Sequence, residues 1–149
     1  LGLAWDEPPV RQSERLPLYR AALGELWDRG LLYPCTCARR DIFEAASAPQ
    51  EGAPLLGPDG IVYPGTCRGR DRAGPLPEGL ALRLDMSRAA QGPDLEWVEA
   101  GTPRRLEPRR LAREAGDVVL ARRDFGTSYH LAVVVDDAAQ GISHVTRGE

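Results

Sequence analysis

Residues 116–149 read GDVVLARRDFGTSYHLAVVVDDAAQGISHVTRGE, and they carry the most regular pattern in the chain. The apolar run at 117–121 predicts a strand. Either Thr127 or Ser128 can cap a following helix, because a hydroxyl oxygen accepts from the free N–H groups of the first helical turn. This segment therefore begins as a strand followed by a helix.

The helix is expected to continue to Ala139, although its middle is rich in valine. By propensity alone the valines at 133–135 favour a strand, but the residues after them continue a helical pattern. Gly141 is placed to end the helix, and residues 142–146 predict a second strand. Because a crossover helix of this kind joins parallel strands, residues 117–147 predict one strand–helix–strand unit.

Outward from this unit, short elements alternate with loops rich in turn residues. Apolar residues between positions 12 and 29 recur at spacings of three and four, which predicts a helix ended by Gly30. The prolines and glycines of residues 49–60 predict a loop. Four further short elements are predicted from apolar patterns: strands at 31–33, 80–85 and 95–98, and a helix at 41–46. The chain is thus expected to be α/β.

The composition restricts the classes of function. With 149 residues the chain can bury a core of one domain, and 22 acidic against 19 basic residues argue against binding nucleic acid by bulk charge alone. No stretch is apolar enough to span a bilayer, and residues 1–10 lack the pattern of a secretory signal. We expect a cytoplasmic protein without membrane contact and, because the sequence starts at Leu1, a fragment of a longer protein.

Three cysteines are the strongest candidates for a functional site. Cys35 and Cys37 are too close in sequence for a comfortable disulfide, and Cys67 lies beyond the loop. Zinc takes four tetrahedral ligands and favours thiolates, so a zinc site is one interpretation and ordinary thiols on a loop are the other. Three nearby side chains could complete such a site: Tyr63, Asp59 and Asp71.

The arginine-rich segment 104–113 also has two interpretations. Its charges could face RNA, or they could form an ordinary solvated surface. Charge runs usually lie on the surface, so we interpret this segment as solvated. An RNA-binding role stays open as the alternative.

Several blocks, taken together in their order along the chain, resemble a known family. They are QSER at 12–15 followed by Tyr19, GLLYPCTC at 30–37, and the whole of 116–149. In this order they resemble the middle of the catalytic domain of class I glutamyl-tRNA synthetases. The resemblance implies a partial Rossmann-type class I aminoacyl-tRNA synthetase core, of which the strand–helix–strand unit is part, with a zinc-binding knuckle inserted at 31–70.

The resemblance also separates two branches of that family. In the shorter branch, the glutamyl-Q tRNA(Asp) synthetases, it implies a Cys-x-Cys and Tyr-x-x-x-Cys ligand set, which is here Cys35, Cys37, Tyr63 and Cys67. In zinc-containing full-length glutamyl-tRNA synthetases, a histidine is expected two positions after the third cysteine. This chain has Gly69 there, so it resembles the shorter branch.

That branch implies an ATP-dependent ligase in which zinc is structural and ATP is a substrate. The enzyme would activate L-glutamate and transfer it to queuosine in the anticodon of tRNA(Asp), acting as a monomer. Tyr129 and Arg147 are similar to the pair that binds glutamate, since Arg offers a planar fork to a carboxylate and Tyr adds one directed hydrogen bond.

The ATP-binding signatures of the family are expected before Leu1 and after Glu149. No residue in 1–149 resembles a catalytic acid or base, so this part of the catalytic domain is expected to be inactive alone. Two alternatives remain: a fragment of a full glutamyl-tRNA synthetase that charges tRNA(Glu), and a non-catalytic zinc-bearing module that binds RNA through segment 104–113.

Overall fold

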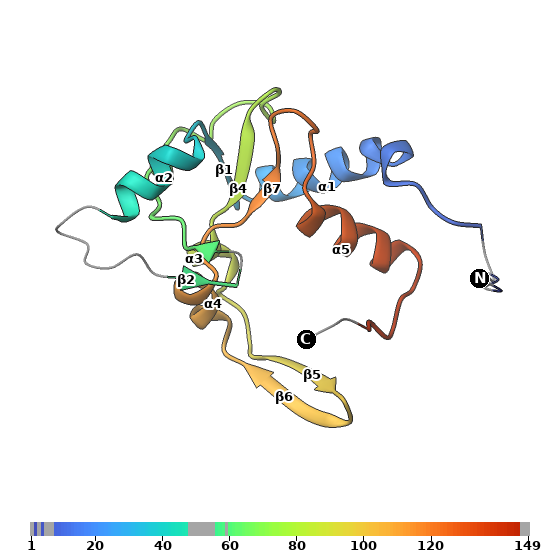
Figure 1. Ribbon diagram of the computed structural model, residues 1–149. Coiled ribbons are helices and arrows are strands. Elements are labelled where there is room, and N and C mark those ends of the chain that lie inside the picture. The colour runs from blue at the N-terminus through green and yellow to red at the C-terminus, as the bar shows by residue number, and fades with distance from the viewer. Residues whose placement is uncertain (1, 3, 5–7, 48–55, 59, 147–149) are drawn as a thin grey trace.

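The computed structural model describes residues 2, 4, 8–47, 56–58 and 60–146, and the structural statements below refer to them. Its elements along the chain (Figure 1) are the 3-10 helix η1 (Gln12–Glu14), α1 (Leu16–Asp28), β1 (Leu32–Cys35), α2 (Arg39–Ala46), β2 (Leu56–Gly57), β3 (Gly60–Ile61), β4 (Ala81–Leu84), α3 (Met86–Ala89), β5 (Leu95–Glu99), β6 (Thr102–Leu106), α4 (Pro108–Glu114), β7 (Val119–Ala121) and α5 (Tyr129–Ala139).

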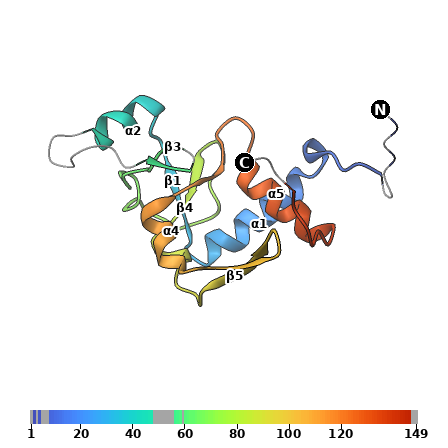
Figure 2. The same ribbon diagram turned by 60° about the horizontal axis from the view of Figure 1, so that its bottom comes forward.

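The centre of the fold is an antiparallel sheet in the order β1-β4-β7. On one face, Leu32, Leu82 and Leu120, one from each strand, are buried in the main hydrophobic core. Helices α1 and α5, which lie side by side in both views (Figure 1, Figure 2), cover this face and supply the rest of that core. Burying a leucine side chain contributes about 2 kcal/mol, so this face supplies much of the stabilisation.

The opposite face of the same sheet carries a second, smaller cluster. Side chains alternate between the two faces of a strand, so Tyr33 and Cys35 of β1 point away from the main core. They pack with Tyr63 and Cys67 from the loop that follows β3. Arg83, which pairs with Tyr33 across β1 and β4, contacts this cluster as well. The sheet thus separates an apolar core from a sulfur-rich site.

A buried carboxylate joins the two covering helices. Asp136 of α5 accepts from the Tyr19 hydroxyl of α1 at 2.7 Å and from Arg15 Nε, just before α1, at 2.7 Å. Asp136 is 6% exposed. Burial and the neighbouring carboxylate both raise the pKa of Tyr19, which therefore stays protonated and continues to donate.

The helix predicted at 12–29 is confirmed, with an interruption near its start. The chain makes η1, turns at Arg15 and then begins α1 with Pro17 in its first turn. Proline is tolerated there because it lacks only an N–H that the first turn leaves unbonded. Gly30 ends the helix in the left-handed region, with φ of 67°.

Helix α5 is confirmed despite its three valines. Ser128 has an extended backbone, and its side chain accepts from the Leu131 N–H at 3.4 Å, as an N-cap does. Gly141 follows the helix with φ of 64°. Burial of Leu131 and Ala132 against the sheet outweighs the intrinsic strand preference of residues 133–135.

The prediction of a second strand in the strand–helix–strand unit is wrong. Residues 142–146 adopt no strand, and Ile142 and Val145 are 48% and 72% exposed. A strand needs a hydrogen-bonding neighbour, and within the described part of the chain no strand pairs with this segment. The first strand and the helix of that unit are confirmed as β7 and α5.

Four of the remaining short elements were predicted, whereas α3, β6, α4 and the small hairpin of β2 and β3, which begins within the predicted loop 49–60, were not. The strands predicted at 31–33, 80–85 and 95–98 are β1, β4 and β5, and the helix predicted at 41–46 is α2. β5 continues into β6 through Ala100 and Gly101, both with positive φ, as a tight hairpin turn requires. This hairpin projects away from the central sheet (Figure 1). Among the described helices, none is both long and apolar enough to cross a membrane.

Candidate metal centre and adjoining cavity

Three thiols and one phenol meet at the second face of the sheet. Cys35 ends β1, Cys37 follows two residues later, and Tyr63 and Cys67 lie on either side of a turn after β3. The turn forms because Gly65 adopts a φ of 84° and its carbonyl oxygen accepts from the Arg68 N–H at 2.8 Å. The three sulfur atoms all lie within 4.8 Å of one another, close enough to hold a metal ion.

The hydroxyl oxygen of Tyr63 occupies a fourth position beside these sulfurs. It lies 3.5 Å from Cys35 Sγ and 3.4 Å from Cys37 Sγ, and Cys37 Sγ lies 3.5 Å from Cys67 Sγ. The backbone N–H of Cys67 donates to the Tyr63 oxygen at 2.9 Å. That N–H uses one lone pair of the oxygen and Cys35 Sγ also donates to it, while either atom could be the donor in the contact with Cys37 Sγ.

Of the other two candidates for the fourth ligand, one lies away from the thiols and one is outside the described residues. Asp71 is exposed, and its carboxylate accepts from the Ala73 N–H at 2.9 Å in a local turn, away from the thiols. Asp59 lies outside the described residues. Of the three alternatives, the structure brings Tyr63 to the cysteines.

The thiols have unequal acidities. Burial tends to raise the pKa of Cys67, but hydrogen bonds from the Tyr63 hydroxyl, the Thr36 N–H and the neighbouring thiols lower it to about 6. Burial raises the pKa of Cys37, and burial together with the three thiols raises that of Tyr63. Without a metal, therefore, the Cys67 thiolate is favoured, while the raised pKa values of Cys37 and Tyr63 favour their protonated forms. A divalent cation would favour the deprotonated form of all four groups.

Arg83 is a member of the site that sequence reasoning missed. It is 9% exposed, its Nε donates to Cys35 Sγ at 3.3 Å, and its guanidinium lies 3.8 Å above the centre of the Tyr63 ring. The available signal was its position: it interrupts the apolar residues of a strand whose two faces are both covered. An arginine there needs a buried partner, but its position in the strand does not say which.

Behind the metal centre lies a buried carboxylate, Asp117. It accepts from the Tyr33 hydroxyl at 2.5 Å, from Arg68 Nε at 2.8 Å and from the Met86 N–H at 2.9 Å. The hydrogen bond to Asp117 raises the pKa of Arg68. Asp117 leads into β7, so this network joins the sulfur cluster to that strand.

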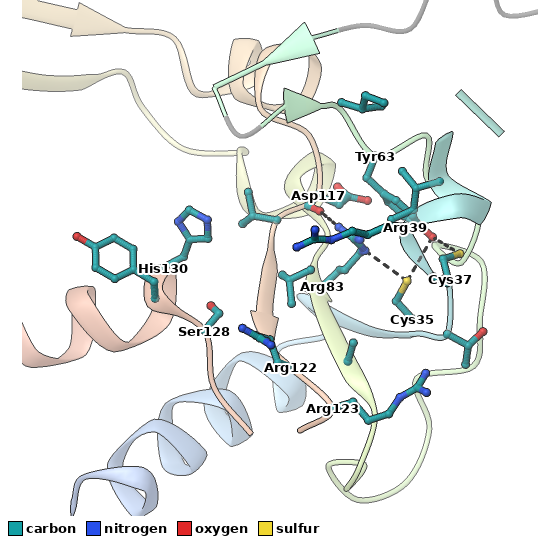
Figure 3. Close-up of a pocket in the computed structure, with 18 of the residues that line it drawn as sticks. Cys35, Cys37, Arg39, Tyr63, Arg83, Asp117, Arg122, Arg123, Ser128 and His130 are labelled. Atoms are coloured by element: carbon teal, nitrogen blue, oxygen red, sulfur yellow. Dashed lines mark hydrogen bonds between the residues drawn. The ribbon is translucent and has the colours of Figure 1, made fainter. Parts of the chain in front are cut away.

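A cavity of about 820 Å³ connects the metal centre to the start of α5. Cys35, Cys37 and Arg83 line one end, and Ser128 and His130 line the other (Figure 3). Tyr129, the first residue of α5, also borders the cavity and is 72% exposed. It is thus a surface aromatic available to a ligand, and not part of the apolar core. Arg147, its predicted partner, lies outside the described residues.

The arginine-rich segment 104–113 lies away from this cavity in β6 and α4. Three of its five arginines pair with carboxylates of the same hairpin and helix: Arg104 with Glu99 at 3.1 Å, Arg105 with Asp94 at 2.5 Å, and Arg110 with Glu114 at 2.8 Å. The three arginine side chains are about half or more exposed. Exposed pairs of this kind contribute little to stability, and they agree with a solvated surface.

Comparison with known proteins gives one consistent likeness. No family model matches the chain. Over its whole length it is similar to proteins named glutamyl-Q tRNA(Asp) synthetase from Rhodobacter capsulatus, at 62% identity over 157 residues, from Nocardia farcinica, at 45%, and from Rhodopirellula baltica, at 39%. It covers 55%, 44% and 46% of these proteins. The chain thus spans about half the length of the curated relatives it matches.

Proposed function

We propose that the chain, which is similar over its whole length to proteins named glutamyl-Q tRNA(Asp) synthetase, belongs to that family and forms part of an ATP-dependent ligase that activates L-glutamate and transfers it to queuosine in tRNA(Asp). The observation that carries this choice of branch is the position of the Tyr63 oxygen among the three cysteine sulfurs. A tyrosine in that position replaces the histidine expected in zinc-containing full glutamyl-tRNA synthetases, for which the chain has Gly69.

Zinc is the metal proposed for this site, held by Cys35, Cys37, Tyr63 and Cys67. In a tetrahedral zinc site two thiolate sulfurs lie about 3.8 Å apart, and a sulfur and an oxygen lie about 3.5 Å apart, given bond lengths of about 2.3 and 2.0 Å. The 3.5 Å between Cys37 Sγ and Cys67 Sγ, and the 3.4 and 3.5 Å from sulfur to the Tyr63 oxygen, are close to these values, and all three sulfurs lie within 4.8 Å of one another. Four protein ligands leave no position for substrate, so the zinc is structural.

The glutamate site is proposed at the far end of the cavity. Tyr129 would donate one hydrogen bond to the substrate, and Arg147 would bind a carboxylate through its planar guanidinium. The exposure of Tyr129 toward the cavity supports this role. No acid or base is assigned to the chain, so its contribution is to position glutamate next to ATP and the tRNA.

The proposed ligase has a Rossmann-type core that this chain completes only in part. Residues 31–70 are the zinc-binding insertion, and β7 with α5, within 117–147, belongs to the nucleotide-binding part. We place the protein in the cytoplasm as a monomer, with ATP, L-glutamate and queuosine-bearing tRNA(Asp) as its partners. The relatives' greater length supports the view that further segments hold ATP.

The test of this proposal is glutamate-dependent exchange of pyrophosphate into ATP, measured with the full-length protein in the presence and absence of tRNA. Tyr129→Phe should raise KM for glutamate tenfold or more, because a hydrogen bond to a charged group contributes about 1.5–3 kcal/mol. Trp97→Phe, on the distant hairpin, is the matched control and should leave KM unchanged. A folded protein with no glutamate-dependent exchange would contradict the proposal.

A further inference from the structure

Arg83 contacts the proposed zinc site although it is not one of the four proposed ligands. Its guanidinium touches two of the four ligands, through the Nε hydrogen bond to Cys35 Sγ at 3.3 Å and the stack on the Tyr63 ring at 3.8 Å. Its Nη1 donates to the backbone carbonyl oxygen of Asp117 at 2.7 Å. A single buried side chain therefore connects the ligands to the segment that enters β7.

We propose that Arg83 is the counter-charge of this metal centre, and that it increases metal affinity by stabilising the anionic forms of Cys35 and Tyr63. The inference rests on the proposed zinc site. Three thiolates and a phenolate carry four negative charges, so a divalent ion leaves two uncompensated. Uncompensated charge is costly where Cys35 and Tyr63 are only 2% and 5% exposed.

The chemistry of arginine suits this task. Its guanidinium stays protonated in proteins, so it remains a cation even when buried. Its planar face fits the tyrosine ring while its edge donates to sulfur and carbonyl oxygen, so the three contacts are compatible in one orientation. The Asp117 carbonyl fixes that orientation from the opposite side.

The nearby arginines do not share these contacts. Arg68 donates to the Asp117 carboxylate, and its side chain is 40% exposed. Arg72 lies over the Tyr33 ring at 5.4 Å and pairs with Asp85 at 2.7 Å. Arg72 therefore resembles Arg83 in being a largely buried arginine on a tyrosine ring with a buried acceptor, but none of its hydrogen bonds or ring contacts involves a metal ligand.

This likeness provides the matched experiment. Zinc affinity is measured in the full-length protein by competition with a chelator of known affinity, and folding is checked by far-UV circular dichroism. Arg83→Met should weaken zinc binding about 10- to 100-fold, the usual cost of losing an outer partner of a metal ligand. Arg83→Lys, which keeps the charge, should lose less, and Arg72→Met should bind zinc as the wild type does.

A spectroscopic readout separates this role from simple structural support. With cobalt(II) in place of zinc, Arg83→Met should shift the thiolate-to-metal charge-transfer band, because Cys35 loses a hydrogen bond, while Arg72→Met should leave the band in place. Unchanged affinity and an unchanged band in Arg83→Met would overturn the inference, as would Arg83→Lys binding as weakly as Arg83→Met. A folded wild type that binds no zinc would instead refute the zinc site itself.

Discussion

Tyr63 is the residue on which the assignment of the metal ligands depends. Its hydroxyl oxygen lies 3.5 Å from Cys35 Sγ and 3.4 Å from Cys37 Sγ, which is close to the separation of two ligands bound to one metal ion. The same oxygen accepts from the Cys67 N–H. Tyr63→Phe removes that oxygen and leaves three thiolates. We expect zinc affinity, measured by chelator competition at fixed pH, to fall at least tenfold, because the fourth position of the tetrahedron would be taken by water.

The control for this substitution is Tyr33→Phe. Tyr33 belongs to the same buried cluster, but its hydroxyl donates to Asp117 and not to a thiol. Its loss should lower stability and leave zinc affinity unchanged. Zinc content and affinity in Tyr63→Phe equal to those of the wild type would remove Tyr63 from the ligand set and weaken the branch assignment.

Gly116 is a second residue whose identity the structure requires. Its φ is 69°, and a Cβ there would lie 2.6 Å from Val62 Cγ1. Gly116→Ala should therefore lower the free energy of unfolding by about 1–3 kcal/mol, as measured by urea denaturation. Gly141→Ala, with a φ of 64° but open space around its Cβ, carries the backbone strain alone and should cost less. An equal loss in the two variants would argue against the contact with Val62.

Residue types and spacing were sufficient to find the cysteine cluster, but not to complete the candidate metal site. Cys35, Cys37 and Cys67 stood out as one candidate site, although the same spacing also allowed ordinary thiols on a loop. Spacing alone left Tyr63, Asp59 and Asp71 equivalent, and the family resemblance was needed to choose among them. Arg83 escaped notice because its partners come from three separate segments, which only the folded chain brings together.

At the scale of elements, the contact between α1 and α5 depends on Asp136. Asp136→Asn keeps the shape of the side chain but removes the charge that Arg15 and Tyr19 share. We expect a loss of about 2 kcal/mol in the free energy of unfolding, typical of a hydrogen bond to a charged group. Asp137→Asn is the control, since the described structure gives the Asp137 side chain no hydrogen bond or ion pair. Equal stability of Asp136→Asn and the wild type would contradict this account.

Asp85, the residue that caps the start of α3, makes the stability of the protein depend on pH. Burial alone would raise the pKa of Asp85, but hydrogen bonds from Ser87, Arg72 and the Arg88 N–H hold it below its usual range. Because the pKa in the folded state lies below the unfolded value of about 3.9, the carboxylate's contribution is complete well above that value. The contribution is then lost as pH falls through the folded pKa.

The corresponding measurement is the urea midpoint of the wild type and of Asp85→Asn between pH 7 and pH 3. Asp85→Asn should be less stable at pH 7, and the difference between the two proteins should shrink below about pH 4, where Asp85 takes up a proton in the unfolded wild type while the folded state keeps it ionised. A constant difference across this range would show that the ionised carboxylate is not what stabilises α3.

Elements with a strong local signal were predictable from the sequence. α1 has apolar spacing of three and four with a terminal glycine, and a serine cap and a terminal glycine mark the ends of α5, whose valines are held in the helix by burial against the sheet. The strand predicted at 142–146 had a similar local pattern, but no strand among the described residues lies beside it. A strand forms only when a second strand pairs with it, and the local sequence of one segment does not identify its partner.

At the scale of the whole molecule, the order β1-β4-β7 was not predictable. These strands are separated by long segments that contain helices and hairpins of their own, and the spacing of apolar residues does not indicate which strand lies beside which or in what direction. The arrangement has a functional consequence, because it places the metal centre and the start of α5 on one cavity. Residues far apart in sequence, such as Cys37 and Tyr129, thereby border the same space (Figure 3 shows the cavity).

The proposed transfer of glutamate to a modified tRNA is the central claim. Its most direct test supplies the full-length protein with ATP and labelled glutamate, together with two purified substrates in parallel: tRNA(Asp) bearing queuosine and tRNA(Glu). We predict label on the queuosine-bearing tRNA(Asp) alone. Label on tRNA(Glu) would contradict the account and assign the chain to a full glutamyl-tRNA synthetase, and label on neither would leave a zinc-bearing RNA-binding module as the alternative.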